Sequence, residues 1–75
     1  MDAVRQQDII MQFGKRLKTI RMEKNLSTRQ LSDIAEIDPG NINEIENGKI
    51  NPGLITIARL AEALEIEISD FFTIK

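Results

Sequence analysis

The 75-residue sequence contains no cysteine, histidine, tryptophan or tyrosine. Without cysteine it has neither a disulfide framework nor a thiolate metal site, and without histidine it lacks the usual zinc ligand and general base. It also has no glycine-rich phosphate loop, no zinc-protease motif and no nucleophile beside a base. The carboxylates of Asp33, Glu36 and Asp38 are explained by helix and capping positions. We therefore expect no enzymatic activity, no cofactor and no bound metal.

Long apolar runs are absent as well. No run approaches the about 18 residues that span a bilayer, and the first residues lack the charged-then-apolar order of a secretion signal. We therefore expect a cytoplasmic protein with no membrane contact. With 41% apolar residues, the chain predicts one domain over residues 1–75 with a modest core, to which a partner subunit would add stability. For want of a second domain, we expect no small-molecule ligand.

The most informative stretch is residues 27–48, which predicts two short helices joined by a turn. Ser27 and Gln30 have the spacing of a reciprocal capping box, so the first helix should begin at residue 28 and bury Leu31, Ile34 and Ala35.

The second helix of this pair should begin at Pro39, because Asp38 is an N-cap residue and proline is tolerated in a first turn. Gly48 supplies the left-handed conformation that commonly ends a helix. Its inner face holds Ile42, Ile45 and Glu46. Its outer face is small and polar, with Gly40, Asn41, Asn43, Glu44 and Asn47.

The whole chain predicts an all-α fold, a compact bundle of five helices after a flexible leader at residues 1–7. Asp8 is expected to cap the first helix, and Asn25 is expected to be a left-handed residue at its end. Glu65 is expected to end the fourth helix, where a left-handed conformation would cost a non-glycine residue about 1 kcal/mol. The helices are expected at approximately residues 8–25, 28–36, 39–47, 53–64 and 69–72.

The formal net charge of −2 conceals an uneven distribution. Between Lys15 and Arg29 there are six basic residues and one acid, whereas from Pro52 to Lys75 there are two basic and four acidic residues. Contacts with DNA phosphates need local rather than overall positive charge, so the basic stretch is typical of a protein with one DNA-facing side. A solvated basic helix would have the same composition.

Three segments carry a resemblance to a known family: residues 30–35 (QLSDIA), residues 42–49 (INEIENGK) and the pair Asn51-Pro52. From about Phe13 to Phe72, the chain resembles the repressor/Cro-type family, also called the xenobiotic-response-element family. This resemblance implies a lambda-repressor-like bundle whose helix-turn-helix motif, residues 27–48, binds the major groove of DNA. Glu36 departs from the family at a position that usually holds glycine. Pro39, Gly40 and Glu44 depart where the family has small or basic residues.

The second helix of the motif supplies the candidates for base recognition. Asn41 and Asn43 can each bond an adenine through N6 and N7. Glu44 can accept a hydrogen bond from the N4 amino group of a cytosine; the alternative is that its carboxylate, repelled by nearby phosphates, disfavours binding to other sequences. Gly40 reduces side-chain bulk where the helix enters the groove. Candidates for phosphate contact, some of them implied by the resemblance, are Thr28, Arg29, Gln30, Asn47, Lys49 and Asn51, with long-range attraction from Lys15 or Lys18.

The resemblance also implies an ion pair between Arg21 and Glu46; the alternative is two solvated surface charges.

Apolar side chains near the C-terminus that a chain this short cannot fully bury predict a homodimer, whose two-fold symmetry would match a palindromic DNA site. The expected interface residues are Ile66, Ile68, Phe71, Phe72 and Ile74. We expect a sequence-specific, duplex-DNA-binding transcriptional regulator, similar to a phage-type repressor or a restriction-modification controller. The alternative is a protein-interaction or antitoxin-like module of the same fold without strong DNA affinity.

Overall fold

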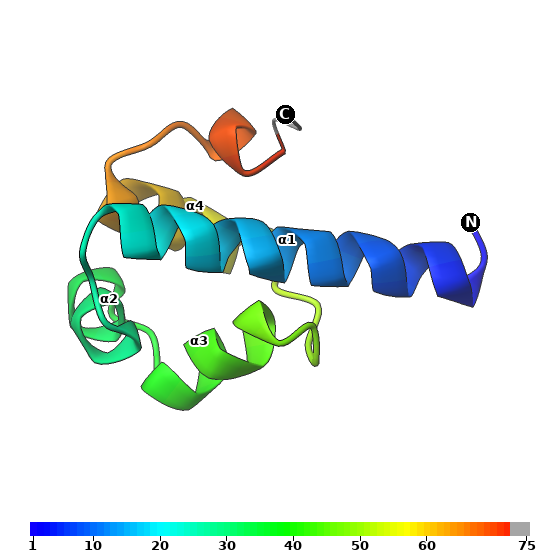
Figure 1. Ribbon diagram of the computed structural model, residues 1–75, viewed down its shortest axis with the longest axis horizontal. Helices are drawn as coiled ribbons and strands as arrows, with labels where there is room; N and C mark the ends of the chain where they lie inside the picture. The colour runs from blue at the N-terminus through cyan, green and yellow to red at the C-terminus, as the bar shows by residue number, and fades with distance from the viewer. Residues whose placement is uncertain (73–75) are drawn as a thin grey trace.

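The computed structural model describes residues 1–72, and all regular secondary structure in that range is helical (Figure 1). The predicted all-α fold with five helical segments is confirmed, although the last segment is a 3₁₀ helix. Within the described range, none of the helices combines the length and apolar character needed to cross a membrane. The elements are α1 (Ala3–Glu23), α2 (Thr28–Ala35), α3 (Pro39–Glu46), α4 (Leu54–Leu64) and η1 (Ile68–Phe72).

The helix α1 begins earlier than the sequence predicts. Asp2 caps it in place of Asp8, because the Asp2 side chain accepts a hydrogen bond from the backbone N–H of Arg5 at 2.8 Å. Residues 3–7 are helical, so the expectation that residues 1–7 form a leader outside the first helix is wrong from residue 3 onward. One cause is tertiary: the Gln7 side chain donates a hydrogen bond to the Gly48 carbonyl oxygen at 2.8 Å.

The two motif helices begin where their caps predict. Ser27 and Gln30 form both bonds of the capping box, and the Asp38 side chain accepts from the Gly40 N–H at 2.7 Å. The buried face of α2 differs from the prediction, because Ile34 is 55% exposed while Ser32 is buried beside Leu31 and Ala35. The Ser32 hydroxyl can occupy this interior position because it donates to the Arg29 carbonyl oxygen at 2.7 Å.

Each of the four α-helices is followed by a residue in the left-handed conformation. The structure confirms the left-handed conformation predicted at Asn25 and Gly48, with φ of 58° and 71°. Glu65, expected to end the fourth helix, has a φ of 57°. Glu36 also has a φ of 57°, so the geometry is retained at the position where glycine is usual in the family, at a cost on the order of 1 kcal/mol. Backbone bonds across each helix end satisfy carbonyl groups that would otherwise have no partner, for example Ile66 N–H to Ala61 O at 3.0 Å.

The helix α1 runs the length of the molecule and divides its other elements. In Figure 1, α2 and α3 lie on one side of α1, η1 lies on the opposite side and α4 passes behind. The Phe13 ring of α1 packs against the Phe71 ring of η1, with ring centroids 5.0 Å apart. The core between the helices is aliphatic, and its most deeply buried side chains are Leu17, Leu31, Ile42, Ile45, Leu60 and Leu64.

Candidate nucleic-acid interface

The helix α3 presents one polar face to solvent. Ile42 and Ile45 are 0% and 1% exposed, so they anchor the inner side of the helix in the core. Because these two residues set the rotation of the helix, the side chains between and around them point outward. The outward residues are those expected from the sequence, and all five are exposed: Gly40, Asn41, Asn43, Glu44 and Asn47.

Three candidates for base recognition have side chains without a partner among the described residues. Neither Asn41, Asn43 nor Glu44 forms a side-chain hydrogen bond to another residue in the range 1–72. Their amide and carboxylate groups therefore remain available to a ligand on this face. Gly40 has no side chain at the start of the helix, so the helix end can approach a groove closely.

An ion pair holds the far end of α3 against α1. Arg21 donates from Nε to Glu46 Oε2 at 2.7 Å and from Nη2 to Glu46 Oε1 at 3.1 Å, which is a bidentate arrangement. Its third nitrogen, Nη1, donates to the Leu26 carbonyl oxygen at 2.6 Å. The two side chains are only 11% and 5% exposed, so the alternative of two solvated surface charges does not describe this pair.

A glycine allows the backbones of α1 and α3 to approach each other. A Cβ atom placed on Gly14 would lie 2.2 Å from the Ile45 carbonyl oxygen and 2.8 Å from the Glu46 carbonyl oxygen. Because both are backbone atoms, no side-chain rotation could relieve the contact. The position of α3 is thus set by direct backbone packing as well as by the ion pair.

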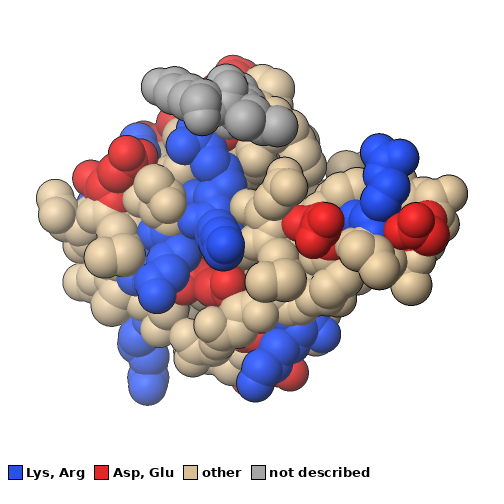
Figure 2. All heavy atoms as spheres, turned by 45° about the vertical axis from the view of Figure 1, so that its right-hand side comes forward, with Lys and Arg blue, Asp and Glu red and all other residues tan. Residues whose placement is uncertain are grey.

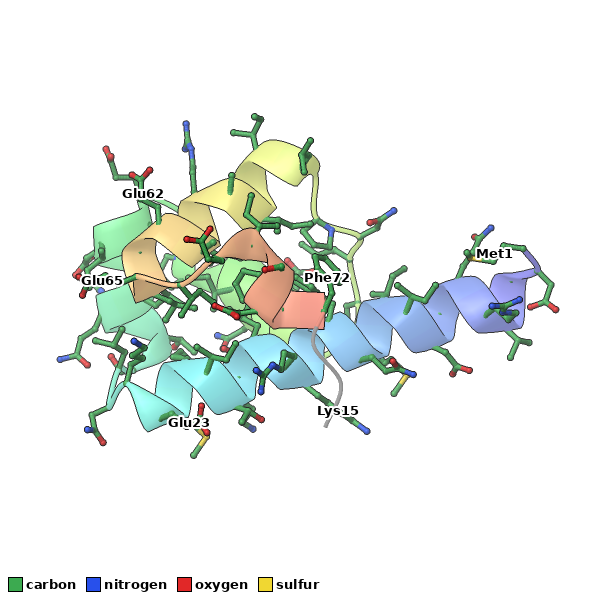
Figure 3. The ribbon with its side chains drawn as sticks, turned by 90° about the horizontal axis from the view of Figure 1, so that it is seen from above. Met1, Lys15, Glu23, Glu62, Glu65 and Phe72 are labelled. Carbon is green, nitrogen blue, oxygen red and sulfur yellow. The ribbon has the colours of Figure 1, made fainter. Side chains whose placement is uncertain are left out.

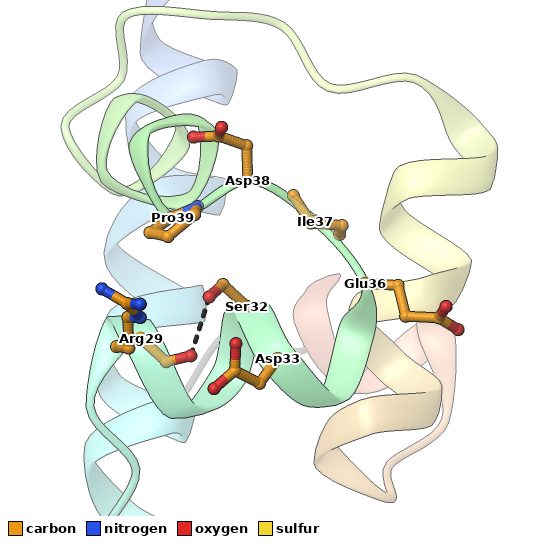
Figure 4. A pocket seen from close by; sticks show the side chains of 7 residues that line it. All are labelled: Arg29, Ser32, Asp33, Glu36, Ile37, Asp38 and Pro39. Atoms are coloured by element: carbon orange, nitrogen blue, oxygen red, sulfur yellow. Dashed lines mark hydrogen bonds between the residues drawn. The ribbon is translucent and has the colours of Figure 1, made fainter.

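The candidates for phosphate contact flank α3 at both ends. At the start of α2, Arg29 and Gln30 are exposed and Thr28 is partly exposed, and Arg29 lines the same surface depression as Pro39 (Figure 4). At the other end of α3, Asn47, Lys49 and Asn51 are exposed. The Gln30 amide oxygen is committed to the Ser27 N–H, so its amide nitrogen is the group that can still donate to a phosphate.

The depression between α2 and α3 has a volume of about 580 Å³ and is bordered by three carboxylates. Its lining is formed by Arg29, Ser32, Asp33, Glu36, Ile37, Asp38 and Pro39. The three carboxylates of the border would repel a polyanion, so Arg29 is the one residue of this lining suited to a phosphate contact. Among residues 1–72, no group of three or more histidine, cysteine or acidic residues is arranged to hold a metal ion.

Basic side chains gather on one face of the molecule. Figure 2 shows Lys and Arg side chains forming a band across the middle of this face. Lys15 and Lys18 on α1 are exposed, and Lys15 points away from the helix bundle in Figure 3. Arg16 is partly buried, since its Nε donates to the Asp70 carbonyl oxygen at 3.0 Å and so joins α1 to η1.

The apolar residues expected at a dimer interface have different environments. Phe71 is 3% exposed within the core of its own chain, so its assignment to an interface is wrong: its ring is already used against Phe13. Phe72 and Ile68 are 55% and 40% exposed, and Ile66 is half-buried. Ile74 lies outside the described residues.

Three residues that shape this surface were missed by the analysis of sequence. Gln7 and Met11 of α1 contact the loop after α3, and Gly14 allows the close approach of the two helices. Only Gly14 carried a usable signal, because a glycine within an apolar helical stripe often marks a close backbone contact.

Comparisons with known proteins agree with this geometry. A family model described as a helix-turn-helix domain matches residues 14–75. The chain is 32% identical over 60 residues to the HTH-type transcriptional regulator PuuR of Escherichia coli, covering 80% of this chain but only 32% of PuuR, so it spans about a third of that relative. It is 34% identical over 67 residues to the control protein C.MunI of Mycoplasma sp, covering 88% and 90% of the two chains.

A solved structure has the same fold. The restriction-modification controller protein C.AhdI from Aeromonas hydrophila superposes with a TM-score of 0.85 at 34% sequence identity. The match covers 87% of this chain and 98% of that one. The four α-helices and the terminal helical turn are thus the arrangement found in a regulatory protein of similar size.

Proposed function

The chain belongs to the helix-turn-helix domain family, of the repressor/Cro type, and from this premise we propose that it is a small transcriptional regulator that binds duplex DNA sequence-specifically. One observation carries the proposal: the unpartnered polar face of α3 lies between two sets of exposed donors, at the start of α2 and in the loop after α3. This is the arrangement needed to read base edges in the major groove while phosphates are held on both sides.

The residues have distinct proposed roles. Asn41, Asn43 and Glu44 contact base edges, and Gly40 lets the helix end approach them. The phosphate contacts come from Thr28, Arg29, Gln30, Asn47, Lys49 and Asn51, with longer-range attraction from Lys15 and Lys18. The control protein C.MunI and the controller protein C.AhdI, each 34% identical to this chain, support a regulator of the restriction-modification controller type. Its proposed site of action is the cytoplasm.

Selection from a random duplex library tests this function. We expect one sequence to be enriched, and Asn41→Ala or Asn43→Ala to relax the preference at single base pairs by ~1–3 kcal/mol. Lys49→Ala should instead weaken binding to every duplex and reduce the slope of log K against log salt by about 0.9, because one phosphate contact is lost.

Arg59→Ala is the matched control for Lys49→Ala. Arg59 is an exposed basic residue on α4 beside Glu62. Its substitution by alanine also removes one positive charge, but at a position outside α3 and the loop that follows it. It should leave the salt slope unchanged. If no sequence is enriched and no duplex binds at low salt, DNA binding is excluded and the protein-interaction module, favoured by the acidic depression beside α3, takes its place.

We also propose that the protein acts as a homodimer through η1 and its neighbours. The exposed side chain of Phe72, together with Ile68 and half-buried Ile66, supports this proposal. Phe72→Ser should shift the sedimentation coefficient from dimer to monomer at micromolar concentration, because a large apolar contact is lost. Val4→Ser is the control and should leave the sedimentation coefficient unchanged, since Val4 is an apolar residue, 72% exposed, at the start of α1 and outside the proposed interface. A wild-type protein that sediments as a monomer at high micromolar concentration would contradict the proposal.

A further inference from the structure

The first three turns of α1 form a feature of this chain that the family model does not include. That model begins at residue 14, whereas α1 begins at Ala3 and extends beyond the rest of the molecule (Figure 1). Most side chains of this extension are exposed, and Met1 lies at its far end in Figure 3. Burial of apolar surface therefore gives little reason for it to be present.

Two side chains of the extension contact the loop that follows α3. The Gln7 amide nitrogen donates to the Gly48 carbonyl oxygen at 2.8 Å, in a partly buried site 41 residues away in sequence. Met11, one helical turn after Gln7, packs on the same glycine: a Cβ on Gly48 would lie 2.7 Å from Met11 Cγ. Residues four apart share one side of a helix, so α1 presents both groups to this loop together.

The bond from Gln7 acts on the peptide unit that connects Gly48 to Lys49. Gln7 holds the carbonyl oxygen of this unit, and its N–H, which belongs to Lys49, donates to the Glu44 carbonyl oxygen at 2.9 Å. Because a peptide unit is planar, holding both of its polar ends fixes the direction in which the chain leaves α3. That direction sets where the Lys49 side chain begins.

We propose that Gln7 is a positioning residue for DNA binding, which orients Lys49 toward a phosphate by clamping the Gly48–Lys49 peptide. This inference rests on the proposed function. Lys49 is exposed and has no bond of its own side chain to residues 1–72, so its backbone is the means by which the protein orients it. A loop ordered before binding loses less conformational entropy in the complex, so affinity rises without a new contact to DNA.

The test is a double-mutant cycle on the selected duplex. Gln7→Met keeps the length of the side chain and its helical preference but removes the donor, and we expect it to weaken binding about 3- to 10-fold, the size of one hydrogen bond. Gln6→Met is the matched control, because the Gln6 side chain donates to the carbonyl oxygen of Met1, which precedes the same helix, and not to the loop after α3. It should change affinity less than about twofold. In a Lys49→Ala background, the effect of Gln7→Met should largely disappear.

Hydrogen exchange on the free protein provides a second measurement. The Lys49 amide should exchange faster in Gln7→Met than in Gln6→Met, while the amides of the buried helices are unchanged. Equal affinities for the two variants, or a Gln7→Met effect that persists undiminished without the Lys49 side chain, would overturn the inference and leave DNA binding standing. Failure of the unaltered protein to bind any duplex would instead overturn the proposed function, and the inference with it.

Discussion

Replacing Glu46 by alanine is expected to lower the free energy of unfolding by ~3–5 kcal/mol. The substitution leaves the Arg21 guanidinium in a largely buried site with one remaining acceptor, the Leu26 carbonyl oxygen. A buried cation without its partner retains the cost of desolvation but loses the attraction that offset it. A domain of this size has only ~5–10 kcal/mol of stability in total, so the loss would remove a large share of it. Urea denaturation followed by circular dichroism measures this loss.

Glu44→Ala is the matched control for this substitution. Glu44 lies on the same helix but is exposed and forms no ion pair with residues 1–72, so its removal should change the free energy of unfolding by less than about 0.5 kcal/mol. The combined change Arg21→Met and Glu46→Leu should recover most of the loss, because it replaces both charges with apolar groups. Equal stabilities of Glu46→Ala and Glu44→Ala would show that the pair is effectively solvated.

Gly14→Ala is expected to be destabilising by about 3 kcal/mol or more, although alanine is the stronger helix former. The new methyl group would have to occupy space 2.2 Å from the Ile45 carbonyl oxygen, which is forbidden by van der Waals contact. The helices α1 and α3 would therefore separate, and the bidentate bonds between Arg21 and Glu46 would lengthen with them. Thermal and urea unfolding should both reveal the loss.

Gly53→Ala provides the comparison for Gly14→Ala. A Cβ on Gly53 meets no atom within 4 Å, and its φ of −74° is available to any residue, so we expect a change of no more than about 1 kcal/mol. Gly14→Ala should also bind the selected duplex more weakly than the unaltered protein does, because α3 has moved. This is measured at a temperature at which the Gly14→Ala protein is still folded. An unaltered melting temperature for Gly14→Ala would mean that the two backbones are not in contact.

The sequence alone determined where most helices begin and end. The capping box of Ser27 and Gln30, the Asp38 cap and the left-handed residues Asn25 and Gly48 were all predictable. Each of these features depends on hydrogen bonds between groups two to five residues apart, so the order of residue types along the chain is sufficient to predict it. The outward polar face of α3 followed for the same reason, from the spacing of Ile42 and Ile45.

Only the tertiary structure decided how these helices are held against one another. The exposure of Ile34 and the burial of Phe71 depend on which neighbours lie nearby. The contacts of Gly14 and Gln7 join α1 to residues more than 30 positions later, where no local periodicity constrains the pairing. Helix formation is a matter of bonds along a few residues, whereas docking depends on side-chain volumes and backbone directions that meet only when the chain has folded.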